Sequence, residues 1–196
     1  MPDEPIPELT EEQRIKQRIA ADAAGSMFTD PDPESREAAW RQWQQTSGVW
    51  SETRDALNIP DDAGEYAGGL EAVLRRIPDG WGRWISCGPG WYPLICELDS
   101  TLAQLDSAYI VHQVKEKFGT LRFYAESDRF TGLRDEFYAH ISAAEARTAE
   151  TCELCGERGQ LCETAPHPQR RWLKTLCPAC AADGDRGRAY APVQDS

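Results

Sequence analysis

The chain has 196 residues, a formal net charge of −12 and a hydrophobic content of 40%. Its length fits one domain with an appendage or two small domains, and its hydrophobic content is sufficient for a buried core. No run of 18 apolar residues is present, and no apolar segment follows the acidic residues 1–5, so we expect neither a membrane span nor a signal peptide. The odd number of cysteines, seven, favours a reducing compartment, and we expect a cytoplasmic protein.

The negative charge is concentrated in the first half of the chain. Residues 1–60 hold 12 acidic and 6 basic residues, whereas residues 151–196 hold 6 of each. Such an acidic segment repels nucleic acid, and it either keeps the protein solvated or binds a basic partner. Any nucleic acid is therefore expected to contact the C-terminal half of the chain.

Residues 1–62 are predicted to form an acidic helical region that is partly flexible. A capping box at Thr10 and Gln13 starts a helix that runs to about residue 24, and a second helix begins near Ser35. Trp40 and Trp43 fall on one face of this second helix, where they serve either core packing or a partner.

Residues 63–149 are predicted to form an α+β core in which a β-hairpin lies between helices. Apolar residues at helical spacing predict helices over residues 64–77, 91–105 and 133–148. Alternation over residues 109–125 predicts the hairpin, with its turn at residues 116–119. The carboxylates of the central helix, Asp99 among them, are placed mostly away from its apolar face.

Glycine and tryptophan recur before the central predicted helix, most clearly in Gly88-Pro-Gly-Trp91. No Gly-Lys-Ser/Thr follows, so this segment is not a phosphate-binding loop. We expect the backbone to pack closely there beneath large rings.

Two Cys-x-x-Cys pairs near the C-terminus predict a zinc module over residues 150–184. The pairs are separated by 21 residues, and a strand over residues 172–176 leads to the second pair. Two facing knuckles of this spacing supply four thiolates in a tetrahedron, as in a zinc-ribbon-like or treble-clef-like module. Cys162 or His167 remains an alternative ligand, and residues 185–196 are predicted to be a disordered tail. The predicted zinc ligands are Cys152, Cys155, Cys177 and Cys180.

The stretch His112-Gln-Val-Lys-Glu-Lys-Phe-Gly-Thr-Leu-Arg-Phe-Tyr124 resembles a family of uncharacterised bacterial and phage-encoded proteins. Members carry this block, then a helix with Ala-Glu, here Ala144-Glu145, then a cysteine knuckle and a Trp-x-x-Thr-Leu-Cys segment. The resemblance covers residues 81–180, and it implies a shared fold and a zinc knuckle, with phage or mobile-element association. It implies no activity.

A closed four-thiolate site leaves the metal no position for water, so we expect a structural zinc ion and a non-enzymatic binding protein. The partner is expected to be a protein, with nucleic acid as the alternative. Basic and aromatic residues around the hairpin and between the knuckles are the candidate contacts. These are Lys115, Lys117, Arg122, Arg170, Arg171, Trp172 and Lys174.

A metal-dependent nuclease is the alternative function. Gln113-Val-Lys115 on a strand matches the spacing of a metal-binding residue and a lysine that steers the attacking water. Asp99 or Asp106 would supply the upstream carboxylate. A finger-type nuclease is disfavoured, because no histidine sits beside a second knuckle as a general base.

Overall fold

The computed structural model describes residues 32–35, 37–39, 41, 54–128, 131–164, 172–185 and 187–193. The chain divides into two compact units, Met1–Ala56 with Asp79–Gly82, and Leu57–Pro78 with Arg83–Ser196. In the first unit, residues 33–35, 37–39 and 41 are helical, where a helix was predicted near Ser35. The predicted helix over residues 10–24 and both Trp40 and Trp43 lie outside the described residues.

Asp32 caps the start of this described helical segment. Its carboxylate accepts hydrogen bonds from the backbone N–H of Ser35 at 3.0 Å and from the Ser35 hydroxyl at 2.8 Å. These bonds to Ser35 lower the pKa of Asp32, as expected for an N-cap carboxylate.

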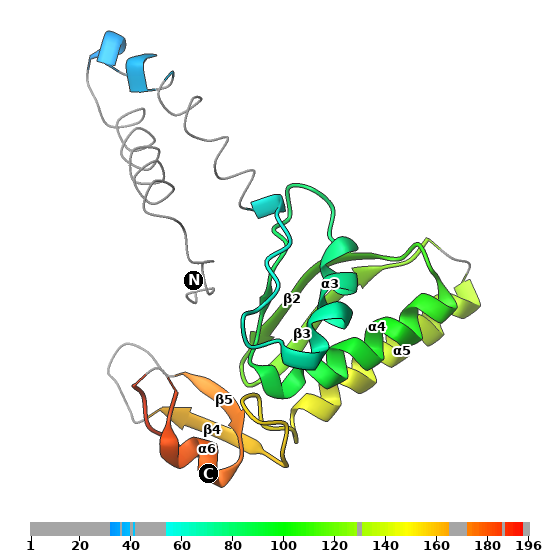
Figure 1. The fold of residues 1–196 in the computed structure, drawn as a ribbon, viewed down its shortest axis with the longest axis vertical. Coiled ribbons are helices and arrows are strands. Elements are labelled where there is room, and N and C mark those ends of the chain that lie inside the picture. The colour runs from blue at the N-terminus through cyan, green and yellow to red at the C-terminus, as the bar shows by residue number, and fades with distance from the viewer. Residues whose placement is uncertain are drawn as a thin grey trace. The chain divides into compact units, whose positions relative to one another are not determined.

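The second unit contains the predicted α+β core (Figure 1). Its sheet has the order β1-β2-β3, with β1 parallel to β2 and β2 antiparallel to β3. The predicted helices and hairpin are confirmed, and no helix among the described residues is long and apolar enough to cross a membrane. The elements are η1 (Gly64–Tyr66), α3 (Ala67–Arg75), β1 (Ile85–Ser86), η2 (Pro89–Trp91), α4 (Tyr92–Leu105), β2 (Ile110–Lys117), β3 (Thr120–Glu126) and α5 (Thr131–Thr148).

The helices form a layer on one face of this sheet. Helix α4 packs against α3 and α5, and α5 packs against β3. Because side chains alternate along a strand, the buried Val114, Leu121 and Phe123 point to this layer, and the residues between them point away. The core between the layers includes Trp91, Leu102 and other fully or almost fully buried side chains.

Helix α5 also closes the free edge of β3. The backbone N–H of Leu121 donates to the Thr148 hydroxyl at 3.0 Å, and that of Phe123 donates to the Glu145 carboxylate at 2.9 Å. These bonds occupy donors that would otherwise pair with another strand. The Ala-Glu pair noted in the sequence therefore holds a structural residue, Glu145.

The expected placement of the α4 carboxylates away from the apolar face is wrong for Asp99, which is 7% exposed. Its Oδ1 accepts a hydrogen bond from Arg76 at 2.6 Å and another from the Tyr109 hydroxyl at 2.5 Å. The Arg76 guanidinium also lies 4.3 Å from the centre of the Tyr109 ring. A carboxylate is tolerated here because a cation and a hydroxyl satisfy it inside the core.

The C-terminal part of the same unit is a small antiparallel sheet with one short helix. It contains β4 (Gln160–Thr164), β5 (Leu173–Leu176), α6 (Pro178–Asp183) and β6 (Tyr190–Pro192), in the sheet order β5-β4-β6. The second cysteine pair opens helix α6, so the order knuckle, hairpin, helix favours the treble-clef-like alternative over a ribbon of two knuckles.

Strand β6 contradicts the prediction of a disordered tail over residues 185–196 for its described residues 187–193; residues 186 and 194–196 lie outside the described residues. Residues 190–192 pair with β4, and Tyr190 is 8% exposed in the second hydrophobic cluster, beside Cys162 and Leu176. The short Tyr-Ala-Pro segment gives little strand signal alone, and it is ordered because Tyr190 covers this small core.

Candidate metal centre

Cys152, Cys155, Cys177 and Cys180 come together at one point of the C-terminal sheet. All four Sγ atoms lie within 4.8 Å of one another, and those of Cys155 and Cys177 are 3.6 Å apart. A tetrahedral ion with metal–sulfur bonds of about 2.3 Å needs neighbouring sulfurs about 3.8 Å apart. The cysteine geometry therefore fits a metal ion with four sulfur ligands.

The first pair is shaped by a tight turn after α5. The backbone N–H of Gly156 donates to the Cys152 carbonyl at 2.9 Å, and the N–H of Cys152 donates to the Glu157 carbonyl at 2.7 Å. Gly156 has a φ of 80°, a left-handed value that favours glycine. This conformation turns both sulfurs of the first pair to one side.

The second pair is shaped by the start of α6. Cys177 is the N-cap of this helix, Pro178 follows in the first turn, and the backbone N–H of Cys180 donates to the Cys177 Sγ at 3.4 Å. This N–H lowers the pKa of Cys177 to about 7. Burial raises the pKa of Cys155 and of Cys180, so a bound cation is what would hold all four as thiolates.

Cys162 does not belong to this group. It is 1% exposed, and its thiol points at the carbonyl oxygens of Gln160 and Leu176, 3.4 and 4.0 Å away. It packs in the small core, and burial raises its pKa. His167, the other alternative ligand, lies outside the described residues.

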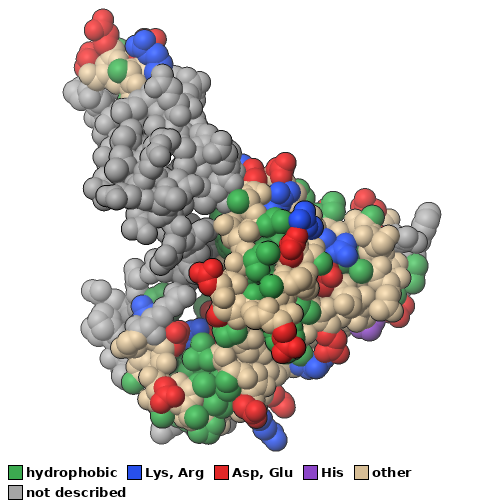
Figure 2. Space-filling model, in the orientation of Figure 1, with side chains coloured by type: hydrophobic (Ala, Val, Ile, Leu, Met, Phe, Trp, Pro, Cys, Tyr) green, Lys and Arg blue, Asp and Glu red, His purple; other side chains and the backbone are tan. Residues whose placement is uncertain are grey.

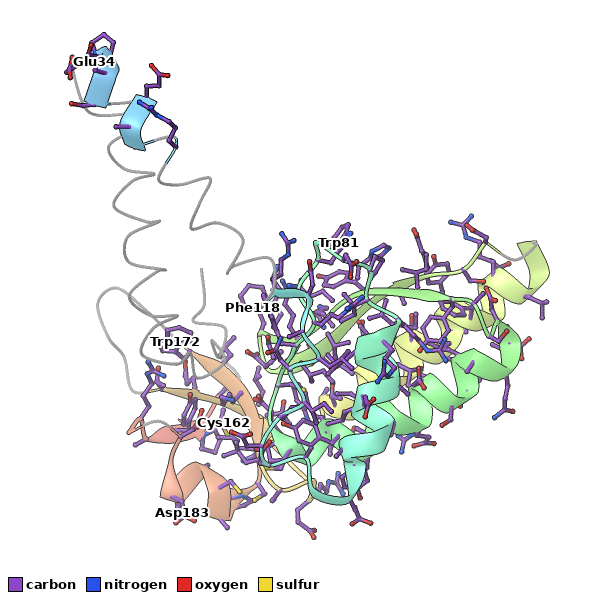
Figure 3. All side chains as sticks on the ribbon, turned by 45° about the horizontal axis from the view of Figure 1, so that its top comes forward. Glu34, Trp81, Phe118, Cys162, Trp172 and Asp183 are labelled. Carbon is purple, nitrogen blue, oxygen red and sulfur yellow. The ribbon has the colours of Figure 1, made fainter. Side chains whose placement is uncertain are left out.

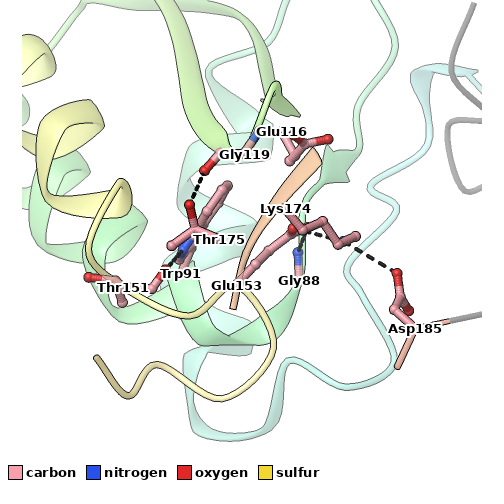
Figure 4. A network of polar contacts seen from close by, with 9 residues as sticks. All are labelled: Gly88, Trp91, Glu116, Gly119, Thr151, Glu153, Lys174, Thr175 and Asp185. Atoms are coloured by element: carbon pink, nitrogen blue, oxygen red, sulfur yellow. Dashed lines mark hydrogen bonds and ion pairs between the residues drawn. The ribbon is translucent and has the colours of Figure 1, made fainter. Parts of the chain in front are cut away.

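The Gly88-Pro-Gly-Trp91 segment packs on the chain around the first cysteine pair, and Figure 4 shows Gly88 and Trp91 beside Glu153 and Thr151. The backbone N–H of Gly90 donates to the Glu153 carbonyl at 2.8 Å, and the Trp91 indole donates to the Thr151 carbonyl at 2.8 Å. A Cβ on Gly90 would overlap the Cys152 carbonyl oxygen and the Gly156 nitrogen. The predicted close backbone packing is confirmed, and it joins the metal centre to the α+β core.

The tip of the β2–β3 hairpin makes a second contact with the C-terminal sheet. The Thr175 hydroxyl of β5 donates to the Gly119 carbonyl at 2.6 Å, and the Leu161 side chain of β4 lies against Gly119. Thr175 also accepts a hydrogen bond through its carbonyl from the backbone N–H of Glu153, at 2.8 Å. Two separate segments of the core therefore hold the metal-binding part in place.

A buried ion pair lies between these two contacts (Figure 4). The Glu153 side chain is 2% exposed, and its carboxylate accepts from the Lys174 ammonium at 2.7 Å and from the backbone N–H of Gly88 at 3.0 Å. Lys174 also lies 3.4 Å from Asp185. Burial opposes the charge of Lys174, but the carboxylates of Glu153, Asp185 and Glu116 together outweigh it and raise the pKa of Lys174. Lys174 thus has a structural partner inside the protein, a role that its position between the knuckles did not reveal.

The other predicted contact residues separate into two groups. Lys115, Lys117 and Arg122 lie on the face of the hairpin that points away from the helices. Trp172 lies just before β5, with the Arg188 guanidinium 4.8 Å from its ring centre. Arg170 and Arg171 lie outside the described residues.

The carboxylates required by the nuclease hypothesis have other partners. Asp99 pairs with Arg76 inside the core, and Asp106 accepts hydrogen bonds from the Ala108 N–H at 3.0 Å and the Ser127 hydroxyl at 2.6 Å. Within the described ranges, the four cysteines form the one group of three or more Cys, His, Asp or Glu residues that could hold a metal. No such group therefore forms around Gln113 and Lys115 in this part of the chain.

Comparisons with protein-family models, with curated proteins and with solved structures find no match for this chain.

Glu116 near the ion pair gives a pH-dependent prediction. Burial raises its pKa, so the folded state binds the Glu116 proton more tightly than the unfolded state does. The ionised carboxylate then opposes folding above its folded pKa, and this effect vanishes once the pH is below the unfolded value of about 4.3. The Glu116 carboxylate accepts a hydrogen bond from the Gly119 N–H at 2.6 Å, and Glu116→Gln retains an oxygen that can accept this bond. We expect it to increase the free energy of unfolding at pH 7, and to do so less at pH 5. Equal gains at both pH values in urea titrations would contradict this origin.

Proposed function

We propose that the protein is a non-enzymatic binding protein that contains one structural zinc ion, held by Cys152, Cys155, Cys177 and Cys180. The observation that carries this proposal is the approach of the four sulfurs within 4.8 Å of one another. Zinc suits such a site, because it favours four tetrahedral ligands and accepts thiolates. Four protein ligands leave no position for a water nucleophile, which supports a structural ion.

The position of the site supports the same role. The metal-binding part is attached to the core by the Gly90 N–H, the Trp91 indole and the Thr175 hydroxyl, which are structural contacts. Zinc would thus stabilise a surface that includes the hairpin and the C-terminal sheet. A protein partner is the preferred ligand of this surface, with nucleic acid as the alternative. A site of four reduced cysteines suits a reducing compartment, and we propose the cytoplasm.

The test combines metal analysis with affinity capture of the native protein. Plasma mass spectrometry of the purified full-length chain should find about one zinc per chain, and gel filtration against a chelator should show it tightly held. Capture from the source cells, followed by mass spectrometry, should identify a partner that is lost after zinc removal. Absence of bound metal would overturn the zinc assignment, and a partner retained equally without zinc would overturn the proposed role of the metal.

A further inference from the structure

Phe118 at the hairpin tip is an unfavourable residue for its position. It has a φ of 57°, the one left-handed non-glycine residue in the described part of the chain, and Gly119 follows with a φ of 80°. Two consecutive left-handed residues between strands form a two-residue hairpin turn that prefers Asn-Gly. A phenylalanine there is strained, because its Cβ crowds the backbone.

The Phe118 side chain gains little burial in return. It is 66% exposed, the highest value among the large hydrophobic residues of the described chain, and Figure 3 shows it at the end of the hairpin. Its one ring contact of note is with the Lys117 ammonium, 5.4 Å from the ring centre. A strained and exposed aromatic residue is better explained by a ligand than by folding.

The face of the hairpin beside Phe118 is basic and aromatic. Lys115 pairs across the strands with Arg122, and Gln113 pairs with Tyr124, so the side chains of all four point away from the helical layer. Tyr124 is 43% exposed, and the Lys115 ammonium lies 5.8 Å from its ring centre. The intervening Glu116 points to the opposite face, which removes its carboxylate from this surface.

The cations of this face form no ion pair among the described residues, although the charge of Arg122 acts on the nearby Glu116 carboxylate. Lys115, Lys117 and Arg122 form no ion pair with a carboxylate of the described residues, whereas Arg76 and Arg147 do. Arg122 donates only to the Thr120 hydroxyl and the Leu121 carbonyl, at 2.6 and 2.8 Å. Figure 2 shows acidic and basic side chains mixed over the face of the molecule that it presents. Glu126 shares this face by strand alternation, but it lies at the end of β3 far from Phe118, 3.3 Å from His112. The part of the face nearest the hairpin tip is therefore basic, in a chain that is strongly acidic.

We propose that this hairpin face, defined by Lys115, Lys117, Phe118, Arg122 and Tyr124, binds single-stranded nucleic acid. The proposal rests on the proposed binding function, and for this face of the hairpin it selects the alternative partner class, nucleic acid. Bases stack on the rings of Phe118 and Tyr124, and the three cations contact phosphates. Exposed rings interleaved with unpaired cations fit a ligand that has both flat bases and a regular negative charge. An acidic protein would use the cations but has no need of the rings.

The salt dependence of this binding follows from the number of cations. Three phosphate contacts on a single strand give a slope of about −2 for the logarithm of the affinity against the logarithm of the salt concentration. The affinity should fall about 20-fold between 50 and 200 mM salt. The net charge of −12 keeps the affinity low, so measurements should begin at low salt.

The test uses the zinc-loaded full chain with fluorescent 15-residue oligothymidylate and oligouridylate, and it reads fluorescence anisotropy. Phe118→Asn is the decisive variant, because it relieves the strain of the turn while it removes the ring. We expect an unchanged or higher melting temperature and an affinity about tenfold lower. Lys115→Gln should lower both affinity and salt slope, whereas Arg75→Gln on α3, with the same change of net charge, should leave the slope unchanged.

Several results would overturn the proposal. These are no anisotropy change up to about 100 µM protein at 50 mM salt, full affinity in Phe118→Asn, or equal effects of Lys115→Gln and Arg75→Gln. Tighter binding of polyglutamate than of either oligonucleotide would instead assign this face to an acidic protein partner. Metal content is measured on the same samples. Each of these results, obtained on protein that retains its zinc, would therefore overturn the nucleic-acid proposal and not the structural zinc ion. Loss of zinc would count against the proposed function alone.

Discussion

Replacing Cys155 with serine is expected to release the metal and to unfold the C-terminal sheet. The variant keeps three thiolates, and the serine hydroxyl is a poor ligand for a thiophilic ion. Because metal binding and folding are coupled in small modules, we expect a loss of several kcal/mol, out of the about 5–15 kcal/mol typical of a domain. The effect should reach the core, because Gly90 and Thr175 connect the two parts.

Limited proteolysis and metal analysis check this result. Protease should cut Cys155→Ser within residues 150–180 much faster than the parent chain, and zinc content should fall well below one ion per chain. Cys96→Ser is the matched control, since Cys96 lies on α4 outside the metal-binding group. That control should retain its zinc. A Cys155→Ser protein that resists cleavage in this region would contradict a metal-dependent fold.

The local elements were predictable because their signals are local. Residues 91–105 show helical spacing of leucine, and the hairpin shows alternation with a glycine at the turn, so both were found close to their observed bounds. The spacing of the cysteines likewise predicts the geometry of the four-sulfur metal site. These features need no knowledge of distant parts of the chain.

The buried polar contacts were not predictable, because each joins residues far apart in the sequence. The Glu153 carboxylate pairs with Lys174 and accepts a hydrogen bond from the Gly88 N–H, and Asp99 pairs with Arg76. In the sequence these residues are ordinary charges near a loop or on a helix, and surface solvation is the sensible reading. Only the tertiary fold shows that Lys174 is committed to an internal partner. The strain at Phe118 was not predictable either, because the sequence places Phe-Gly at a turn but does not determine the φ angle of Phe118.

Gly90→Ala is expected to destabilise the protein by about 3 kcal/mol, although it adds a single methyl group. The methyl group would overlap backbone atoms of Cys152 and Gly156, and it would also lie 2.8 Å from the Glu153 carbonyl oxygen. Backbone atoms that shape a metal knuckle cannot move aside as a side-chain end can. The variant must therefore separate the knuckle from the core or distort the sulfur positions.

Gly68→Ala on α3 is the matched control for this substitution. No atom lies within 4 Å of the added methyl group there, and alanine favours helix over glycine by about 1 kcal/mol. Urea unfolding followed by circular dichroism should thus show a neutral or stabilised Gly68→Ala and a destabilised Gly90→Ala. Competition with a chromogenic chelator should also show weaker zinc binding in Gly90→Ala, because the Gly90 N–H holds the Glu153 carbonyl of the first knuckle. If Gly90→Ala unfolded like the parent and kept its zinc affinity, the Gly90 contact would not couple the core to the metal centre. The contact of Thr175 with Gly119 would then be left as the link between the zinc ion and the hairpin surface.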